Sequence, residues 1–333
     1  MFQNFSKLSI LIAEDLEPMR ELLVDIIKTL GVGTVYKAPD GKSAYRQYVI
    51  KKPDIIITDW HMPEMDGLEL TEKVRKASDS PNRTTPIIMI SGFNAPSRIS
   101  KSRNLGVTEY LSKPFRVEDL SKRISHVVNH PRDFIITPKF VGPDRRRRED
   151  ENFKDKPRRK VDTDKKIKAK KDLQQKTGKG QANPADVTRS EKVMKETKID
   201  FTPTAKKFLK DFKEAIDAAN KTKNYSQRIK ENITFPIMQL KANSHIFKYD
   251  LIGELSKTTL DFLENTNEID HLILEILNAQ HSTLSHLVNT NAKGNGGEEG
   301  KSLRYELEDA YKRYNRARIA EQKAKLLQEN QTD

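Results

Sequence analysis

The chain of 333 residues contains no cysteine and a single tryptophan. Without cysteine it has neither disulfide bonds nor thiolate metal ligands, which fits a reducing compartment. No apolar run reaches the ~18 residues that a membrane-spanning helix needs, and the first residues carry no signal-peptide pattern. We therefore expect a soluble, cytoplasmic protein.

Positive charge is concentrated in the middle of the chain. Residues 131–230 hold 30 lysines and arginines against 16 aspartates and glutamates, a net charge of +14. Residues 1–130 carry a net charge of +3, and residues 231–333 a net charge of −4. Because apolar residues are also scarce from 131 to 199, we interpret that stretch as a disordered basic linker.

The first part of the chain, residues 6–130, alternates between strand and helix patterns. Short apolar runs predict five strands, and amphipathic spacing predicts the helices between them. Nearly unbroken apolar strands are typical of a parallel sheet that is covered on both faces. The sequence therefore predicts a doubly wound α/β domain with ligands at the carboxyl ends of the strands. The expected strands are 8–13, 34–38, 54–58, 86–91 and 107–112.

Helical periodicity dominates the last part of the chain. Apolar stripes predict four amphipathic helices in residues 200–291, joined by short loops, which is typical of an all-α four-helix bundle. A stretch rich in glycine and asparagine follows at 291–300. Beyond it, residues 301–328 predict a charged and exposed helix.

Polar residues stand at the carboxyl ends of the predicted strands. Glu14 and Asp15 follow the first strand, and Asp59 follows the third. Parallel strands bring these ends to one edge, where three carboxylates repel one another unless a cation joins them. Mg²⁺ prefers such oxygen ligands. Ser91 ends the fourth strand and Lys113 follows the fifth, and the set suits phosphoryl transfer to Asp59.

The order of these residues resembles the receiver domain of two-component response regulators, of the chemotaxis type. The resemblance covers residues 6–130 and implies a flavodoxin-like (βα)5 fold. It also implies phosphorylation by a sensor histidine kinase or a histidine phosphotransfer protein. The segments that carry it are Glu14-Asp15, Asp59 with Met62–Gly67, Ser91-Gly92 and Lys113–Phe115.

The resemblance implies roles in phosphoryl chemistry for four residues. Asp59 matches the phosphoacceptor, while Lys113 and Ser91 match the groups that bind phosphoryl oxygens. Tyr110 matches the aromatic switch residue that turns inward when the serine moves toward the phosphoryl group. Phosphorylation is then expected to repack the last strand and helix.

The resemblance also implies a Mg²⁺ site as the cofactor site. Its ligands match Glu14, Asp15, Asp59 and the backbone carbonyl of His61. The His61 side chain is further expected to influence the water that attacks the phosphoryl group. Phe93, two residues after Ser91, is expected to border the site.

Residues 238–248 of the predicted bundle resemble the phosphorylated helix of histidine phosphotransfer domains. The position of the reactive histidine is Met238, so the resemblance implies the bundle without its chemistry. His245 lies seven residues later on nearly the same helix face and remains an alternative, as a displaced phosphohistidine in a phosphorelay. The matching residues are Leu240, Lys241, Ser244 and Phe247.

These patterns favour a response regulator whose output is protein–protein interaction of the helical module, with an unknown downstream protein or a homodimer. The alternative is phosphorylation-controlled nucleic-acid binding through the linker, whose charge favours weak polyanion binding. Gly142–Arg148 is a local docking or anion-binding signal within that linker. We expect no enzyme activity beyond Mg²⁺-dependent self-phosphorylation and self-dephosphorylation.

Overall fold

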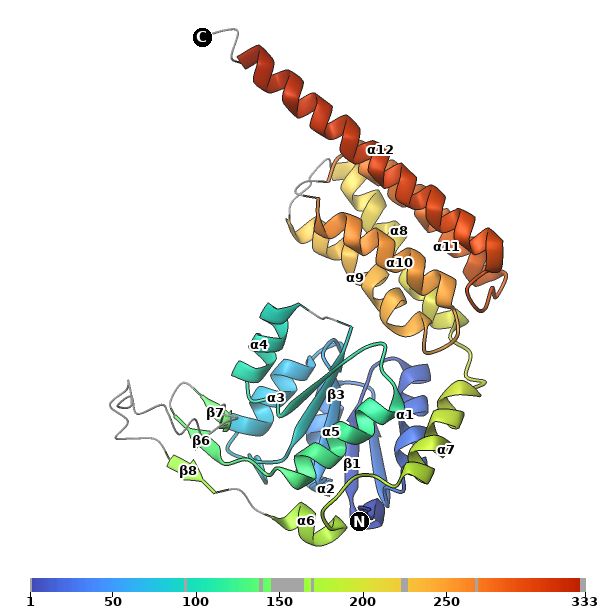
Figure 1. Cartoon of the computed structure of the whole chain (residues 1–333). Coiled ribbons are helices and arrows are strands. Elements are labelled where there is room, and N and C mark those ends of the chain that lie inside the picture. The colour runs from blue at the N-terminus through green and yellow to red at the C-terminus, as the bar shows by residue number, and fades with distance from the viewer. Residues whose placement is uncertain are drawn as a thin grey trace, which may run out of the picture. The chain divides into compact units, whose positions relative to one another are not determined.

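The computed structural model describes residues 2–92, 95–137, 140–144, 165–168, 171–222, 227–266 and 269–329. It consists of two compact units, Met1–Ile199 and Asp200–Asp333 (Figure 1). Phe93 and the arginines at 145–148, which the sequence singles out, lie outside the described residues.

The first unit is built on a five-stranded parallel sheet with strand order β2-β1-β3-β4-β5. Helices connect successive strands and cover the sheet on both faces (Figure 1). The predicted flavodoxin-like fold is confirmed. The strands are β1 (Ser9–Ala13), β2 (Thr34–Ala38), β3 (Ile55–Asp59), β4 (Ile87–Ser91) and β5 (Glu109–Ser112). The helices are α1 (Glu17–Thr29), α2 (Gly41–Lys51), α3 (Gly67–Lys76), α4 (Pro96–Asn104) and α5 (Val117–Asn129), after a short 3-10 turn, η1 (Phe5–Lys7).

Strand β3 and the turn after it hold Asp59 at the edge of the sheet. All five residues of β3 are buried, as the apolar run predicts for a central strand. The turn ends in a capping box, in which Asp66 and Glu69 each accept a hydrogen bond from the other's backbone amide. Gly67 lies so close to β3 that a Cβ there would be 2.1 Å from the carbonyl oxygen of Asp59. The turn after β3 therefore packs directly against the backbone of Asp59.

Residues 131–199 contain folded segments that the sequence analysis did not predict. Three short strands form an antiparallel sheet with the order β7-β6-β8. Two helices follow, and the second packs on α1 and α5. These segments are rich in polar residues, so hydrophobic periodicity gives little signal for them. They are β6 (Phe134–Ile136), β7 (Val141–Pro143), β8 (Lys165–Ile167), α6 (Asp172–Thr177) and α7 (Pro184–Lys195).

The second unit is a helical bundle, as the sequence predicts. Helix α8 packs on α9 and α11, and α9 packs on α10. The core consists of the predicted apolar stripes; its fully buried members include Phe212, Ile216, Ile233, Leu240, Leu263, Ile273 and Leu284. The helices are α8 (Thr202–Thr222), α9 (Gln227–Ser244), α10 (Asp250–Glu264) and α11 (His271–Asn289).

A fifth long helix, α12 (Gly297–Glu329), packs on α10 and α11. The charge of residues 301–328 predicts an exposed helix, but Tyr311 and Tyr314 are buried. The ring of Tyr311 stacks on Phe262 at a centroid distance of 3.9 Å, and its hydroxyl donates to Thr259 Oγ1. Two tyrosines three residues apart thus give an otherwise polar helix a packing face.

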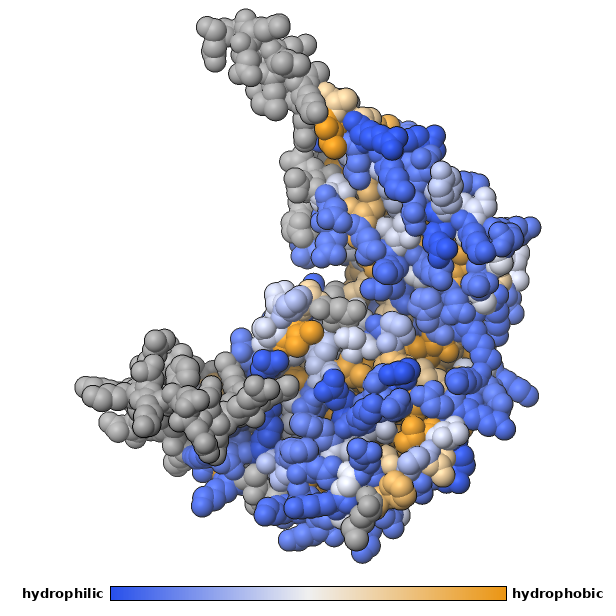
Figure 2. Space-filling model, viewed as in Figure 1, coloured by the Kyte–Doolittle hydropathy of each residue, from blue (hydrophilic) through white to orange (hydrophobic). Residues whose placement is uncertain are grey.

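The visible surface of each unit is mostly hydrophilic, with small hydrophobic areas (Figure 2). None of the helices in the described ranges has both the length and the apolar character that crossing a membrane requires.

Candidate functional site

The polar side chains predicted to form the site meet at the carboxyl edge of the five-stranded sheet. Glu14, Asp59, Ser91 and Lys113 are each at most 4% exposed. Parallel pairing of β1, β3, β4 and β5 sets their relative positions, because it aligns the strand ends. Asp15, in the turn after β1, brings a carboxylate oxygen within 4.8 Å of those of Glu14 and Asp59.

Lys113 bridges two of the carboxylates. Its Nζ lies 2.8 Å from Glu14 Oε2 and 2.9 Å from Asp59 Oδ2. Burial alone lowers the pKa of Lys113, but the charges of Asp59 and Glu14 outweigh it and hold the pKa above its ordinary value. The lysine is therefore a permanent cation beside Asp59.

The Glu14 carboxyl has the most perturbed acidic environment at this edge. Burial raises the pKa of Glu14 to about 8, with Lys113 opposing the shift and Asp59 and Asp15 adding to it. Its Oε1 atom is buried without a hydrogen-bond partner. An orphaned carboxylate oxygen beside two further acids fits a hard divalent cation such as Mg²⁺. The main-chain carbonyl of His61 stays a predicted fourth ligand.

The two oxygens of Asp59 have different partners. Oδ1 accepts a hydrogen bond of 2.5 Å from the Trp60 amide, while Oδ2 faces Lys113. The two contacts fix the orientation of the Asp59 carboxylate from opposite oxygens. Asp59 is therefore held in one orientation at the tip of β3.

Ser91 and Tyr110, the predicted switch pair, lie in contact. Burial raises the pKa of the Tyr110 phenol, while a hydrogen bond with the Ser91 side chain lowers it. The Tyr110 ring also packs edge-on against Trp60, with centroids 6.5 Å apart. The Ser91 hydroxyl is therefore in direct contact with an aromatic residue of β5.

The His61 side chain is partly buried two residues after Asp59. Burial lowers the pKa of His61, so the imidazole is neutral near pH 7. Neutral imidazole has one nitrogen that accepts a hydrogen bond, which is the property needed to orient a water molecule.

Sequence reasoning missed two arginines near the site. Arg20 on α1 donates from Nη1 to the backbone carbonyls of Glu14, at 2.7 Å, and Asp15, at 3.3 Å, and so braces the acidic turn. Arg98 on α4 lies over the Trp60 ring, 5.8 Å from its centroid. The only sequence signal for Arg20 is that it closely follows the acid pair Glu14-Asp15. No sequence signal points to Arg98.

In the helical unit, neither Met238 nor His245 has the surroundings expected of a phosphorylated histidine. Met238 is buried. His245 Nδ1 lies 3.0 Å from Asp250 Oδ1, and its other nitrogen, Nε2, would be 2.6 Å from a Cβ placed on Gly253. A phosphoryl group on Nε2 has little room beside that backbone. The displaced-histidine alternative therefore gains no support from the geometry.

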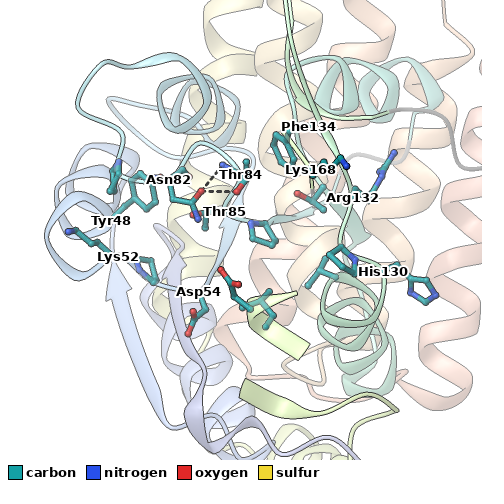
Figure 3. Close-up of a pocket in the computed structure, with 18 residues that line it drawn as sticks. Tyr48, Lys52, Asp54, Asn82, Thr84, Thr85, His130, Arg132, Phe134 and Lys168 are labelled. Carbon is teal, nitrogen blue, oxygen red and sulfur yellow. Dashed lines mark hydrogen bonds between the residues drawn. The ribbon is translucent and has the colours of Figure 1, made fainter. Parts of the chain in front are cut away.

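A small pocket lies at the opposite, amino-terminal edge of the sheet (Figure 3). Its volume is about 190 Å³, below the ~300 Å³ typical of small-molecule sites. Asn82 Oδ1 accepts hydrogen bonds from the amide and hydroxyl of Thr84 within it (Figure 3). Asp54 is paired with Lys176 of α6 at 2.6 Å. These side chains satisfy one another, and Lys168, Asp172 and Leu173 complete the lining of the pocket.

Comparison with known proteins concerns the first unit alone. The family profile described as response regulator receiver domain matches residues 10–125. Chemotaxis protein CheY1 of Helicobacter pylori is 33% identical over 122 residues, 36% of this chain and 97% of that protein. Chemotaxis protein CheY-3 of Vibrio cholerae is 28% identical over 120 residues, 36% of this chain and 91% of that protein.

Solved structures give a similar match. The structure of chemotaxis response regulator CheY4 of Vibrio cholerae is 30% identical with a TM-score of 0.34, and the alignment covers 36% of this chain and 98% of that one. The family profile ends at residue 125 and does not identify the helical unit.

Proposed function

This chain belongs to the response regulator receiver family, and on that premise we propose that it is a two-component response regulator phosphorylated on Asp59. The observation that supports the proposal most strongly is the buried contact between Asp59 and Lys113, beside two further acids. The donor is a sensor histidine kinase or a histidine phosphotransfer protein.

Phosphorylation begins with attack by an Asp59 carboxylate oxygen on the phosphorus of the donor. The new O–P bond forms as the bond between the donor and phosphorus breaks. Lys113 and Ser91 bind the oxygens of the transferred group, because both are buried donors beside Asp59. Glu14, Asp15 and Asp59 would hold Mg²⁺, which would supply positive charge beside the transferred group. Neutral His61 orients the water for later hydrolysis.

The signal then passes to the helical unit. Ser91 follows the phosphoryl oxygens, and Tyr110 repacks against Trp60 because its hydroxyl bonds to that serine. The helical unit acts as a protein-binding module, and it holds no reactive histidine at Met238. The protein works in the cytoplasm and catalyses only its own phosphoryl chemistry.

Labelling with a small phosphodonor tests the proposal without knowledge of the kinase. We expect ³²P from acetyl phosphate to be incorporated in the presence of Mg²⁺, and to be lost with EDTA or in Asp59→Asn. Asp66→Asn is the matched control, because Asp66 caps α3 in the same turn and has no assigned role in the chemistry. Equal labelling of wild type and Asp59→Asn would contradict the proposal.

A further inference from the structure

Helix α7 lies along α1 and α5, outside the segment that matches the receiver family. Ala182, just before α7, bonds to Ser125 late in α5, while Glu191 bonds to Glu118 at its start. Helices α7 and α5 are therefore antiparallel. The carboxyl-terminal half of α7 ends beside the first turn of α5, at the edge of the sheet that carries Asp59.

The segment before α7 is firmly anchored. Backbone amides of Gln3 and Asn4 donate to the carbonyls of Gln181 and Thr177, at 2.8 and 2.9 Å. Two hydrogen bonds join Asn129 and Gly180. Asn129 Nδ2 donates to the Gly180 carbonyl, and the Gly180 amide donates to Asn129 Oδ1. These bonds fix residues 177–182 to the base of the first unit.

Helix α7 itself is held more lightly. Its buried side chains are those of Ser190 and Met194, and Ser190 Oγ donates to the Ile26 carbonyl at 3.3 Å. Glu191 Oε1 accepts from the Glu118 amide at 3.2 Å. A helix of 12 residues is marginal on its own. The change from a multiply bonded segment to a helix with two buried side chains places the hinge at Asn183, the N-cap residue of α7.

The bond from Glu191 connects α7 to the phosphorylation site. Arg116, the N-cap residue of α5, makes no capping hydrogen bond with its side chain. Glu191 therefore caps α5 from outside. Glu118 is five residues after Lys113, whose Nζ lies 2.9 Å from Asp59 Oδ2. Residues 113–118 thus form a short connection between the lysine at the site and the capped turn.

We propose that α7 is a strap whose release from α1 and α5 is coupled to phosphorylation of Asp59. The inference rests on the proposed function. Phosphoryl oxygens lie farther from β3 than Asp59 Oδ2 does, so Lys113 moves outward to follow them. The first turn of α5 follows, the bond to Glu191 is lost, and α7 swings out about the hinge. Release uncovers the faces of α1 and α5, together with the apolar side of α7.

Linkage requires the coupling to act in both directions. A strap that is already open must favour the phosphorylated form. In the full-length chain, Ser190→Asp places a carboxylate against the Ile26 carbonyl and opens the strap. Thr188→Asp adds the same charge on the exposed side of α7 and is the matched control. The probe is beryllofluoride with Mg²⁺, a phosphoryl mimic, followed through the fluorescence of Trp60, the single tryptophan.

We expect Ser190→Asp to bind beryllofluoride about 5-fold or more tightly than wild type, and Thr188→Asp to match wild type. Hydrogen exchange should show faster exchange of the α7 amides when beryllofluoride is added to wild type. Equal affinity of the two variants, together with unchanged exchange of α7, overturns the coupling.

Two further outcomes are decisive. If Ser190→Asp does not fold, as judged by circular dichroism, Met194→Asp replaces it, because Met194 is the other buried side chain of the strap. If wild type itself does not respond to beryllofluoride with Mg²⁺, the proposed function fails. A wild type that responds while α7 stays closed overturns the strap alone.

Discussion

Three acids and one lysine share the edge of the sheet, so the site has an excess of negative charge until a cation binds. Burial, with the charges of Asp59 and Asp15, raises the pKa of Glu14 to about 8, against the opposing charge of Lys113. Mg²⁺ bound beside Glu14 would favour the ionised carboxylate, so its binding would release a proton from Glu14 below about pH 8. Proton release is therefore a direct readout of the metal site.

The affinity for Mg²⁺ should rise with pH from 6 and level off above about 8, the pKa of Glu14. The sign follows because the ionised carboxylate is the form that binds the cation. Titrations of Mg²⁺ at several pH values, read by Trp60 fluorescence, measure this. Glu14→Gln should bind weakly with a flat pH profile. A wild-type affinity that is independent of pH would exclude Glu14 as the titrating ligand.

Removing the lysine should destabilise the first unit. Lys113→Met leaves Glu14 and Asp59 buried without their cation, which costs about 3–5 kcal/mol. Mg²⁺ should restore part of the loss, since it supplies positive charge at the same place. Urea unfolding with and without Mg²⁺ tests this, with the exposed Lys101→Met as control. A loss no larger than that of the control would contradict the account.

Among the elements, the turn between β3 and α3 has the most demanding geometry. A methyl group on Gly67 would stand 2.1 Å from the Asp59 carbonyl oxygen, so the backbone under the nucleophile must move. Asp66, the neighbouring N-cap, contributes to α3 without contacting the nucleophile. Substitutions at Gly67 and at Asp66 should therefore distinguish an effect on the position of Asp59 from an effect on the stability of α3.

Gly67→Ala should reduce Mg²⁺-dependent labelling and lower stability by about 1–3 kcal/mol. Asp66→Ala should cost about 1 kcal/mol through loss of the cap and leave labelling close to wild type. Labelling rates and urea unfolding of the two variants make the comparison. Full labelling of Gly67→Ala would show that the turn does not position Asp59.

Helix α12 offers a test of the second unit. Tyr311→Ala removes the stacking on Phe262 and the bond to Thr259, and should destabilise the unit by about 3–5 kcal/mol. Tyr305→Ala is the control, because Tyr305 is 68% exposed on the same helix. Thermal unfolding measures the difference. Equal unfolding midpoints for the two variants would contradict the packing role of α12.

The elements that sequence predicts are those with strong apolar periodicity. Strands β1, β3 and β4 are apolar runs, and the stripes of α8–α11 are regular, so both cores follow from the pattern. Helix α7 escaped prediction because a serine, Ser190, occupies its most buried position. The site was predicted because strand order fixes where Asp59 and Lys113 meet. The bracing by Arg20 depends on side-chain geometry that spacing does not encode.

At the scale of the whole molecule, the chain joins a receiver unit with a cluster of three acids to a helical unit that carries methionine at position 238. The proposed flow of information is from Asp59 through Ser91, Tyr110 and the strap α7 to protein partners. Only the first step is chemical; the later ones are changes in packing. The identity of the phosphorylated residue is therefore the central test of the proposed function.

Reduction with borohydride identifies that residue most directly, because it converts an aspartyl phosphate to homoserine. After incubation with acetyl phosphate and Mg²⁺, peptide mass spectrometry should find homoserine at position 59, and EDTA should abolish it. Homoserine at another position, or a stable label on His245 with position 59 unmodified, would contradict the account.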